Sequence, residues 1–367
     1  MIDENLLIFG AGLHAQKLAN ALTNSGRRVI GFVISNTLSV THIDEIPVYT
    51  WDSLPAHFFD KYQFACGIFN RSDSYSELEK IMHSHKIKNI LWPWQYYEIL
   101  YGELGWCYWL NENSASLLEL KECPDYSRLY SALADQESKI ILDRLIAFRT
   151  GADINFSSYN SNDHQYFNSL TLNSLPSNVP IRYLDLGAYT GDTLEDFLKH
   201  VEVSQAVLVE PESTNLIKLT RRINSICINY PKLNPYILPV GAGSNFESVQ
   251  LSGYGEASTP LQSNKTAKSS DRNITIVPID SIIPKDDFEF IKIDVEGYDL
   301  EALKGMKNLL KRSNAVLALS VYHRPFDIID LPTYVIDLLD GIPYKYYLRQ
   351  HKNNSFDTVF YAIPLKS

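Results

Sequence analysis

One stretch, Ile181 to Leu194, limits what this chain can fold into more than any other. It opens with an apolar run over 181–186, passes through Gly187 and Gly191, and continues into a segment over 192–200 that predicts a helix. A strand that turns sharply into a helix presents backbone N–H groups, and glycines allow a ligand to approach closely. Open α/β sheets bind nucleotide-like ligands at such turns.

The spacing of this turn separates classes of ligand. Its pattern is Asp-x-Gly-x-x-x-Gly, with Asp185 before the first glycine. It is neither the Gly-x-Gly-x-x-Gly of a dinucleotide turn nor the Gly-Lys-Ser/Thr of a P-loop. An acidic residue suits a ligand that carries an ammonium group, and S-adenosylmethionine (SAM) has an ammonium group and no phosphate. An ordinary strand–turn–helix without a ligand fits the same stretch equally well.

A second acidic residue favours a ligand at this turn. The apolar run Ala206–Val209 ends at Glu210. Its offset from Asp185 is close to the roughly 20 residues at which Rossmann-type sheets place a ribose-binding acid. A carboxylate there can accept hydrogen bonds from both ribose hydroxyls. Glu210 could instead cap the helix predicted from Ser213, but Glu212 is better placed for that cap, so we assign Glu210 to the ribose.

Composition limits the cellular setting and the partners. The chain has 367 residues, 45% of them hydrophobic and 21% charged, which fits a globular protein of two domains. No apolar run is long enough to span a bilayer, and the N-terminus has no signal-peptide pattern. The scattered cysteines indicate a cytoplasmic protein with free thiols. A net charge of −10 argues against nucleic acid as a partner, whereas oligomerisation stays possible.

The first part of the chain contains a weaker nucleotide-binding pattern. The buried-strand run Leu6–Phe9 precedes Gly10-Ala11-Gly12-Leu13-His14-Ala15, and a second strand is predicted over Arg28–Val33. That strand ends in Ile34-Ser35-Asn36, where NAD-binding units carry a carboxylate for the ribose. The glycines could therefore serve only tight packing. We predict three regions: a Rossmann-like domain (1–98), a helical connector (99–150) with a helix over Leu129–Phe148, and a larger domain (151–367).

The larger region predicts an α/β fold with a seven-stranded class I methyltransferase-type (Rossmann-like) sheet. Its apolar runs and helical segments alternate as five parallel strands followed by an antiparallel pair. The carboxyl ends of parallel strands meet at one edge of a sheet. We therefore expect the residues at the ends of those strands to face one crevice, namely Asp185, Glu210, Gly241, Asp294 and His323.

At these positions the chain resembles the FkbM family of SAM-dependent methyltransferases. The resemblance is strongest in Ile291-Lys292-Ile293-Asp294-Val295-Glu296-Gly297, the most distinctive run. It covers roughly the last 230 residues, a domain of ordinary size. The other matching runs are Leu184-Asp185-Leu186-Gly187-Ala188-Tyr189-Thr190-Gly191-Asp192-Thr193, Val209-Glu210-Pro211, Leu303-Lys304-Gly305, Ser320-Val321-Tyr322-His323-Arg324 and Thr358-Val359-Phe360-Tyr361-Ala362.

The resemblance implies methyl transfer from SAM to a hydroxyl oxygen of a sugar, a polysaccharide or a natural product. It places the methionine end of SAM at Asp185, Gly187 and Gly191, the ribose at Glu210 and the methyl group near Asp294 and Glu296. Further cofactor-binding residues are Ala188, Tyr189, Asp192, Thr193 and Pro211, with Gly241 and Ala242 near the adenine.

The acceptor hydroxyl must lose a proton, and three possibilities stay open for this step. His323 is the first candidate for the general base, because an imidazole titrates near neutral pH, and Asp294 is the second. A divalent metal held by Asp294, Glu296 and His323 is possible but not favoured. His323 could also only bond to the backbone. The alternative class is a protein that binds NAD or a sugar nucleotide at its N-terminal Gly-x-Gly turn and has a non-catalytic C-terminal domain.

Overall fold

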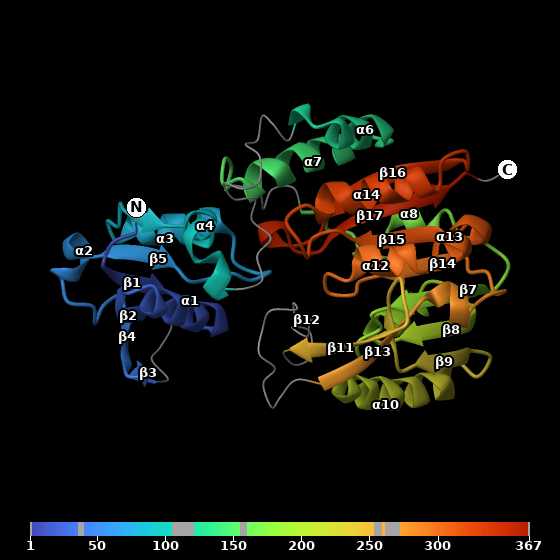
Figure 1. Cartoon of the computed structure of the whole chain (residues 1–367), viewed down its shortest axis with the longest axis horizontal. Coiled ribbons are helices and arrows are strands. Elements are labelled where there is room, and N and C mark those ends of the chain that lie inside the picture. Colours follow the sequence, from blue (N-terminus) through green and yellow to red (C-terminus); the bar gives the residue numbers. More distant parts are fainter. Residues whose placement is uncertain are drawn as a thin grey trace.

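The protein contains one large sheet with flanking helices in each half of the chain (Figure 1). A computed structural model describes residues 2–35, 40–104, 121–154, 160–252, 259–260 and 272–365. Asn36, at the position where a ribose-binding acid is missing, lies outside the described residues. Within the described segments, no helix combines the length and apolar character needed to cross a bilayer.

The N-terminal sheet has six strands in the order β3-β4-β2-β1-β5-β6. Gly10, with a φ of +109°, follows the central strand, and a Cβ there would lie 2.7 Å from Ile68, so this glycine is required by packing. At Gly12 a Cβ would meet nothing within 4 Å. The elements are β1 (Asn5–Phe9), α1 (Leu13–Asn24), β2 (Arg28–Ile34), β3 (His42–Ile43), β4 (Ile46–Thr50), α2 (Phe58–Lys61), β5 (Gln63–Cys66), α3 (Tyr75–Ser84), β6 (Ile90–Leu91) and α4 (Pro93–Leu104).

Where the sequence predicts one helix over Leu129–Phe148, the described part of the connection between the two large sheets forms two. These are α6 (Pro124–Ala132) and α7 (Gln136–Arg149). The single helix is wrong because Asp135 takes an extended conformation and its carboxylate accepts a hydrogen bond from Ser138 N–H, which caps a new helix. Helix α4 runs through residue 98, where we placed the end of the first domain, and the domain limits stay a prediction.

The C-terminal sheet has seven strands in the order β16-β17-β15-β14-β7-β8-β9. Strands β15, β14, β7, β8 and β9 are parallel, and β17 is antiparallel to both β15 and β16. This confirms the predicted class I methyltransferase-type sheet. The strands are β7 (Ile181–Leu186), β8 (Val203–Val209), β9 (Asn234–Leu238), β14 (Phe290–Ile293), β15 (Val316–Ser320), β16 (Tyr344–Gln350) and β17 (Thr358–Pro364).

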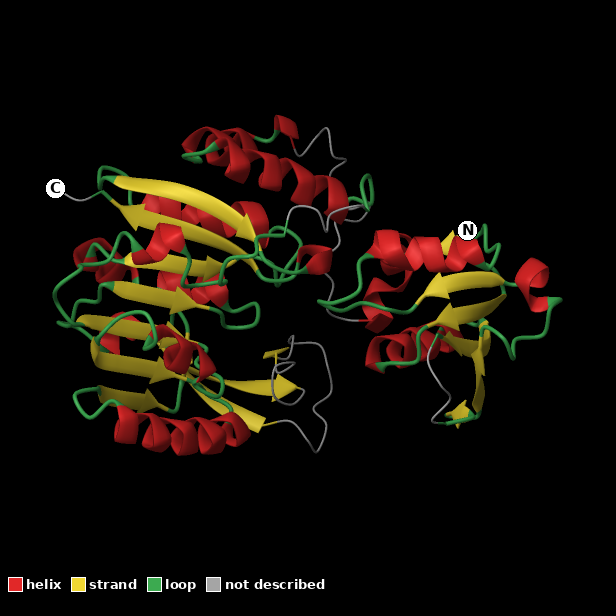
Figure 2. Ribbon diagram, turned by 180° about the vertical axis from the view of Figure 1, so that it is seen from behind, coloured by secondary structure: helices red, strands yellow, loops and turns green. Residues whose placement is uncertain are grey.

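Helices cover both faces of this sheet, which explains why its central strands are buried throughout (Figure 2). Alternate residues of β7 enter two cores: Leu184 and Leu186 join one, and Ile181 and Tyr183 join the other. The helices are α8 (Ser169–Leu172), α9 (Asp192–Phe197), α10 (Ser213–Asn229), α11 (Ile279–Ile282), α12 (Asp299–Lys304), α13 (Lys307–Ser313) and α14 (Asp327–Leu338), with a short 3-10 turn, η3, at Asn353–Ser355.

A small four-stranded sheet lies beside the main one and was not predicted. It contains β10 (Gly241–Ala242), β11 (Glu247–Ser252), β12 (Thr259–Pro260) and β13 (Arg272–Val277). We had placed Gly241 at the end of the third strand of the main sheet. That strand, β9, ends at Leu238, and Gly241 pairs with Ile276 of β13 instead. Gly241 and Ala242 nevertheless stay at the same edge of the molecule, because only two residues separate the strands.

A loop between β5 and α3 of the N-terminal half contacts the segment between β16 and β17. Asn353 donates to the carbonyl of Ser72, at 2.7 Å, and Asn354 donates to the carbonyls of Asn70 and Asp73. Within this loop, Arg71 Nε lies 3.5 Å from Asp357 Oδ1. The loop over 70–74 therefore belongs to the first half of the chain by sequence and to the second half by its contacts.

Arg149, the last residue of α7, ties the connector to the C-terminal sheet. Its side chain is fully buried, and its guanidinium donates to the carbonyls of Tyr322, Arg324 and Pro325 and to Ser355 Oγ. These carbonyls lie in the segment that follows β15. Arg149 therefore positions the backbone on either side of His323.

We predict that Arg149→Met lowers the free energy of unfolding by about 3 kcal/mol or more, because several buried carbonyls lose a charged donor. Arg144→Met on the same helix is the matched control. Arg144 pairs with Asp153 at the surface, so its loss should cost less than about 1 kcal/mol. Urea unfolding followed by circular dichroism measures both. Equal effects of the two substitutions would contradict the assignment.

Candidate active site

One cavity lies at the carboxyl ends of the parallel strands, where the sequence predicts the site. Most of the predicted residues line it, and they come from the turns after β7, β8 and β14 and from β10. The predicted residues in the lining are Gly187, Tyr189, Asp192, Thr193, Glu210, Pro211, Gly241, Ala242, Asp294 and Glu296. Asp185, Ala188, Gly191 and His323 are not part of this lining, and all four are buried.

Gly187 is the point of closest approach between the turns after β7 and β14. Its φ is +86°, and a Cβ on it would lie 1.8 Å from the carbonyl oxygen of Asp294. Asp294 N–H in turn donates to the carbonyl of Leu186, at 2.9 Å. No side chain fits between these two turns, so the glycine lets Asp294 lie directly beside the first strand of the site.

Asp185 does not reach the cavity, because its carboxylate forms a buried ion pair. Lys292 Nζ lies 2.8 Å from Asp185 Oδ1, and the hydroxyl of Tyr183 donates to Oδ2. Burial raises the pKa of Asp185, and Lys292 partly offsets that shift. Burial alone would lower the pKa of Lys292, but the negative charges of Asp185 and Asp294 raise it. Asp185 therefore holds Lys292, which lines the cavity and also donates to the carbonyl of Gly187.

Glu210 lies at the end of β8, where the sequence places it, and is almost fully buried. Its carboxylate accepts hydrogen bonds from the N–H groups of Tyr189 and Glu212 and from the Asn215 amide. Glu212, as predicted, caps helix α10 by accepting from Asn215 N–H. Burial raises the pKa of Glu210 to about 7. These contacts orient the Glu210 carboxylate and leave it in the cavity wall.

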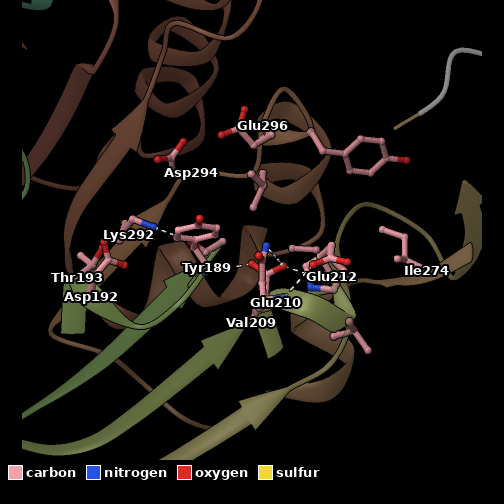
Figure 3. A pocket seen from close by; sticks show the side chains of 18 of the residues that line it. Tyr189, Asp192, Thr193, Val209, Glu210, Glu212, Ile274, Lys292, Asp294 and Glu296 are labelled. Carbon is pink, nitrogen blue, oxygen red and sulfur yellow. Dashed lines mark hydrogen bonds between the residues drawn. The ribbon is translucent and has the colours of Figure 1, made fainter. Parts of the chain in front are cut away.

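The lining is arranged in an order that suits an elongated ligand. In Figure 3, Asp192 and Thr193 lie at one end, Glu210 lies near the middle, and Ile274 lies at the other end. Asp294 and Glu296 lie on the opposite side of the cavity from Glu210. The Ile274 end is apolar, since Val240 and Ile276 also line the cavity with Gly241 and Ala242. The cavity thus offers polar groups at one end, a carboxylate in the middle and an apolar slot at the other.

Asp294 and Glu296 follow β14 and face the cavity. The hydroxyl of Tyr166 donates to Asp294 Oδ2 at 2.9 Å. Glu296 has a φ of +51°, a conformation that non-glycine residues rarely adopt, and Gly297 follows at +88°. Such strain concentrates at functional sites. Burial raises the pKa of Glu296 to about 7.

His323 lies behind the two carboxylates and is 1% exposed. Its Nδ1 lies 3.0 Å from Asp299 Oδ2, and its Nε2 lies 3.1 Å from Asp294 Oδ1. Burial would lower its pKa, but Asp299, Glu296 and Asp294 raise it well above the usual value. His323 was our first candidate for the general base, but it does not line the cavity, because Asp294 and Glu296 lie between them.

Several lining residues were not among the predicted site residues. Arg71 comes from the N-terminal half, Tyr166 from the segment before β7, and Tyr322 and Asp357 from the segments after β15 and η3. Lys292 could have been found from the sequence, because it lies on β14 two positions before Asp294, the residue that follows the strand, and alternate residues face the same side. The other four are far apart in sequence and share no pattern.

Comparisons with known proteins agree with this geometry. The sequence model of the methyltransferase FkbM domain matches residues 185–346. A structure of a methyltransferase FkbM from Methylobacillus flagellatus KT is similar, with a TM-score of 0.72 and 21% identity over 98% of this chain and 90% of that chain. The likeness shows that both halves share its fold. A search of curated proteins found no match.

Two further structures resemble only part of the chain. An rRNA methylase from Streptococcus thermophilus has a TM-score of 0.35 and 13% identity, over 53% of this chain and 92% of its own. A precorrin-6y C5,15-methyltransferase from Geobacter metallireducens GS-15 has a TM-score of 0.31 and 12% identity, over 54% and 87%. Likenesses this weak say nothing about the ligand or the acceptor.

The fold and the cavity at its strand ends define a class I methyltransferase-type protein. The matching domain model confirms the predicted resemblance for this part of the chain: residues 185–346 form a methyltransferase FkbM domain.

We predict that the Asp185–Lys292 pair stabilises the sheet only as a pair. Asp185→Asn or Lys292→Met should each cost about 3–5 kcal/mol, because each leaves a buried charge uncompensated. The double variant should cost clearly less than the sum. Arg182→Met is the control on the same strand, since Arg182 pairs with Glu289 near the surface and its loss should cost at most about 1 kcal/mol. Additive losses in urea unfolding would refute a coupled pair.

Proposed function

We propose that this protein is a SAM-dependent O-methyltransferase whose acceptor is a hydroxyl of a sugar, a polysaccharide or a natural product. One observation carries the proposal: the carboxylates of Asp294 and Glu296 share a single cavity with Glu210 and the glycine turn after β7. A ligand that extends along the cavity therefore brings a central reactive atom next to carboxylates. The choice of acceptor follows the resemblance to the FkbM family.

Successive turns along the chain would hold successive parts of SAM. The turn from Gly187 to Thr193 would hold the methionine end, with Ala188 and Gly191 supporting it from behind. Glu210 and Pro211 would hold the ribose. The apolar slot at Gly241 and Ala242 would hold the adenine, whose flat ring needs apolar contact more than charge. Lys292, anchored by Asp185, would lie beneath the methionine end.

Bound SAM supplies an activated methyl group: a new O–CH₃ bond forms as the S–CH₃ bond breaks, and the electron pair of that bond stays on the sulfur. The protein must hold the acceptor oxygen in line, and correct positioning alone lowers the barrier by several kcal/mol. It must also take the hydroxyl proton. We assign this task to the cavity-facing carboxylates of Asp294 and Glu296, with His323 as the group that positions them.

We predict that S-adenosylhomocysteine binds the wild-type chain and that Glu210→Ala weakens this binding at least about tenfold. A hydrogen bond to a charged group contributes about 1.5–3 kcal/mol, and the ribose offers two donors. Isothermal titration calorimetry measures the affinity. Glu202→Ala, an exposed carboxylate before β8, is the matched control and should leave the affinity unchanged. The absence of binding to the wild type would refute the proposal.

We predict that this affinity depends on pH through Glu210. The unliganded carboxyl has its pKa raised to about 7, so below that pH it is protonated and cannot accept from both ribose hydroxyls. The dissociation constant should rise about tenfold per pH unit as the pH falls below about 7, and it should level off above it. In Glu210→Gln the affinity should be weak and independent of pH. A flat wild-type profile between pH 5.5 and 8 would exclude this role.

A further inference from the structure

Two buried atoms in the carboxylate cluster have no hydrogen-bond partner among the described residues. They are Asp294 Oδ1 and His323 Nε2. They lie 3.1 Å apart, but without the alignment of a hydrogen bond. Buried polar atoms are nearly always satisfied, and each unsatisfied one calls for an explanation. An atom or ion absent from the polypeptide would satisfy both at once.

The other polar atom of each side chain is already held. Tyr166 donates its hydroxyl proton to Asp294 Oδ2, which leaves Oδ1 to face His323. Asp299 accepts from the N–H groups of Val295 and Gly297 and lies 3.0 Å from His323 Nδ1. Because Asp299 is an acceptor, Nδ1 keeps its proton, and a cation that displaces the proton from Nε2 would meet the lone pair of that nitrogen. Histidines that bind metals are oriented by a carboxylate in this way.

Glu296 completes a group of three donors. Its Oε2 lies 3.8 Å from His323 Nε2, and one atom from each of the three side chains lies within 4.8 Å of the others. An ion with ligands at about 2.1 Å in octahedral geometry separates neighbouring ligands by about 3.0 Å and opposite ones by about 4.2 Å. We propose that Asp294 Oδ1, Glu296 Oε2 and His323 Nε2 bind one divalent cation whose remaining positions open to the cavity.

The donor set indicates the kind of ion. Two carboxylates and one imidazole suit Mg²⁺ or Mn²⁺ rather than ions that prefer thiolates. The proposed site also explains the positive φ of Glu296, because this backbone conformation directs the carboxylate toward the same point as that of Asp294. The role of this cation rests on the proposed function: beside the acceptor, it would lower the pKa of a hydroxyl that contacts it. Binding of the ion itself does not depend on SAM.

Mn²⁺ added to the chelator-treated full-length chain tests the proposal. Electron paramagnetic resonance counts bound ions, and pulsed measurements detect the ¹⁴N coupling of a directly bound imidazole. We expect one Mn²⁺ per chain with one imidazole coupling. Glu296→Gln and His323→Gln should weaken binding at least about tenfold, and the second should abolish the coupling. Asp299→Asn should weaken binding about 10–100-fold while keeping the coupling.

Glu289→Gln is the matched control, because it removes a carboxylate at the opposite end of β14. It should bind Mn²⁺ as the wild type does, and thermal melting should show that every variant is folded. If S-adenosylhomocysteine binds but Mn²⁺ does not, the metal site is refuted, His323 Nε2 carries a proton, and the proposed function stands. If Mn²⁺ binds with the imidazole coupling but S-adenosylhomocysteine does not, the metal site is supported and the proposed function fails. Failure of both ligands refutes both.

Discussion

The ion pair between Asp185 and Lys292 is the interaction on which the site depends. Both side chains are buried at the boundary of β7 and β14, so neither charge would be tolerated alone. Lys292 uses a second proton on the carbonyl of Gly187, which fixes the turn that leads into α9. One side chain thereby holds together the two strand ends that contribute the glycine turn and the carboxylates.

The close packing at Gly187 is a second constraint on the same two turns. Because Gly187 has no side chain, the backbone of Asp294 packs against it, and the carboxylate that follows β14 reaches the cavity beside the turn after β7. The Asp185–Lys292 ion pair and the close backbone contact at Gly187 act independently and have the same effect. They bring residues more than a hundred positions apart into one wall, and Glu210 faces them from the next strand.

The sequence predicts the sheet and much of the cavity lining for a specific physical reason. Parallel strands end at one edge, so residues such as Glu210 and Asp294 converge whatever their separation along the chain. The same rule does not give the position of His323, because the end of a strand does not specify which side chains line the cavity and which are covered by them. It is also silent about Tyr166 and Arg71, whose positions depend on how loops fold over the edge. The sequence predicts one helix through Asp135 because the apolar pattern continues across this position, and that pattern does not reveal the local cap that begins a new helix there.

The loop over 70–74 carries Arg71 into a cavity that otherwise belongs to the C-terminal half. Its neighbours in this loop are held by Asn353 and Asn354, two amides close to the end of the chain. The wall of the cavity is therefore assembled from both halves of the polypeptide. Because Asp357 also lines the cavity, the wall that Arg71 helps to form cannot be complete during synthesis until the segment between β16 and β17 has left the ribosome.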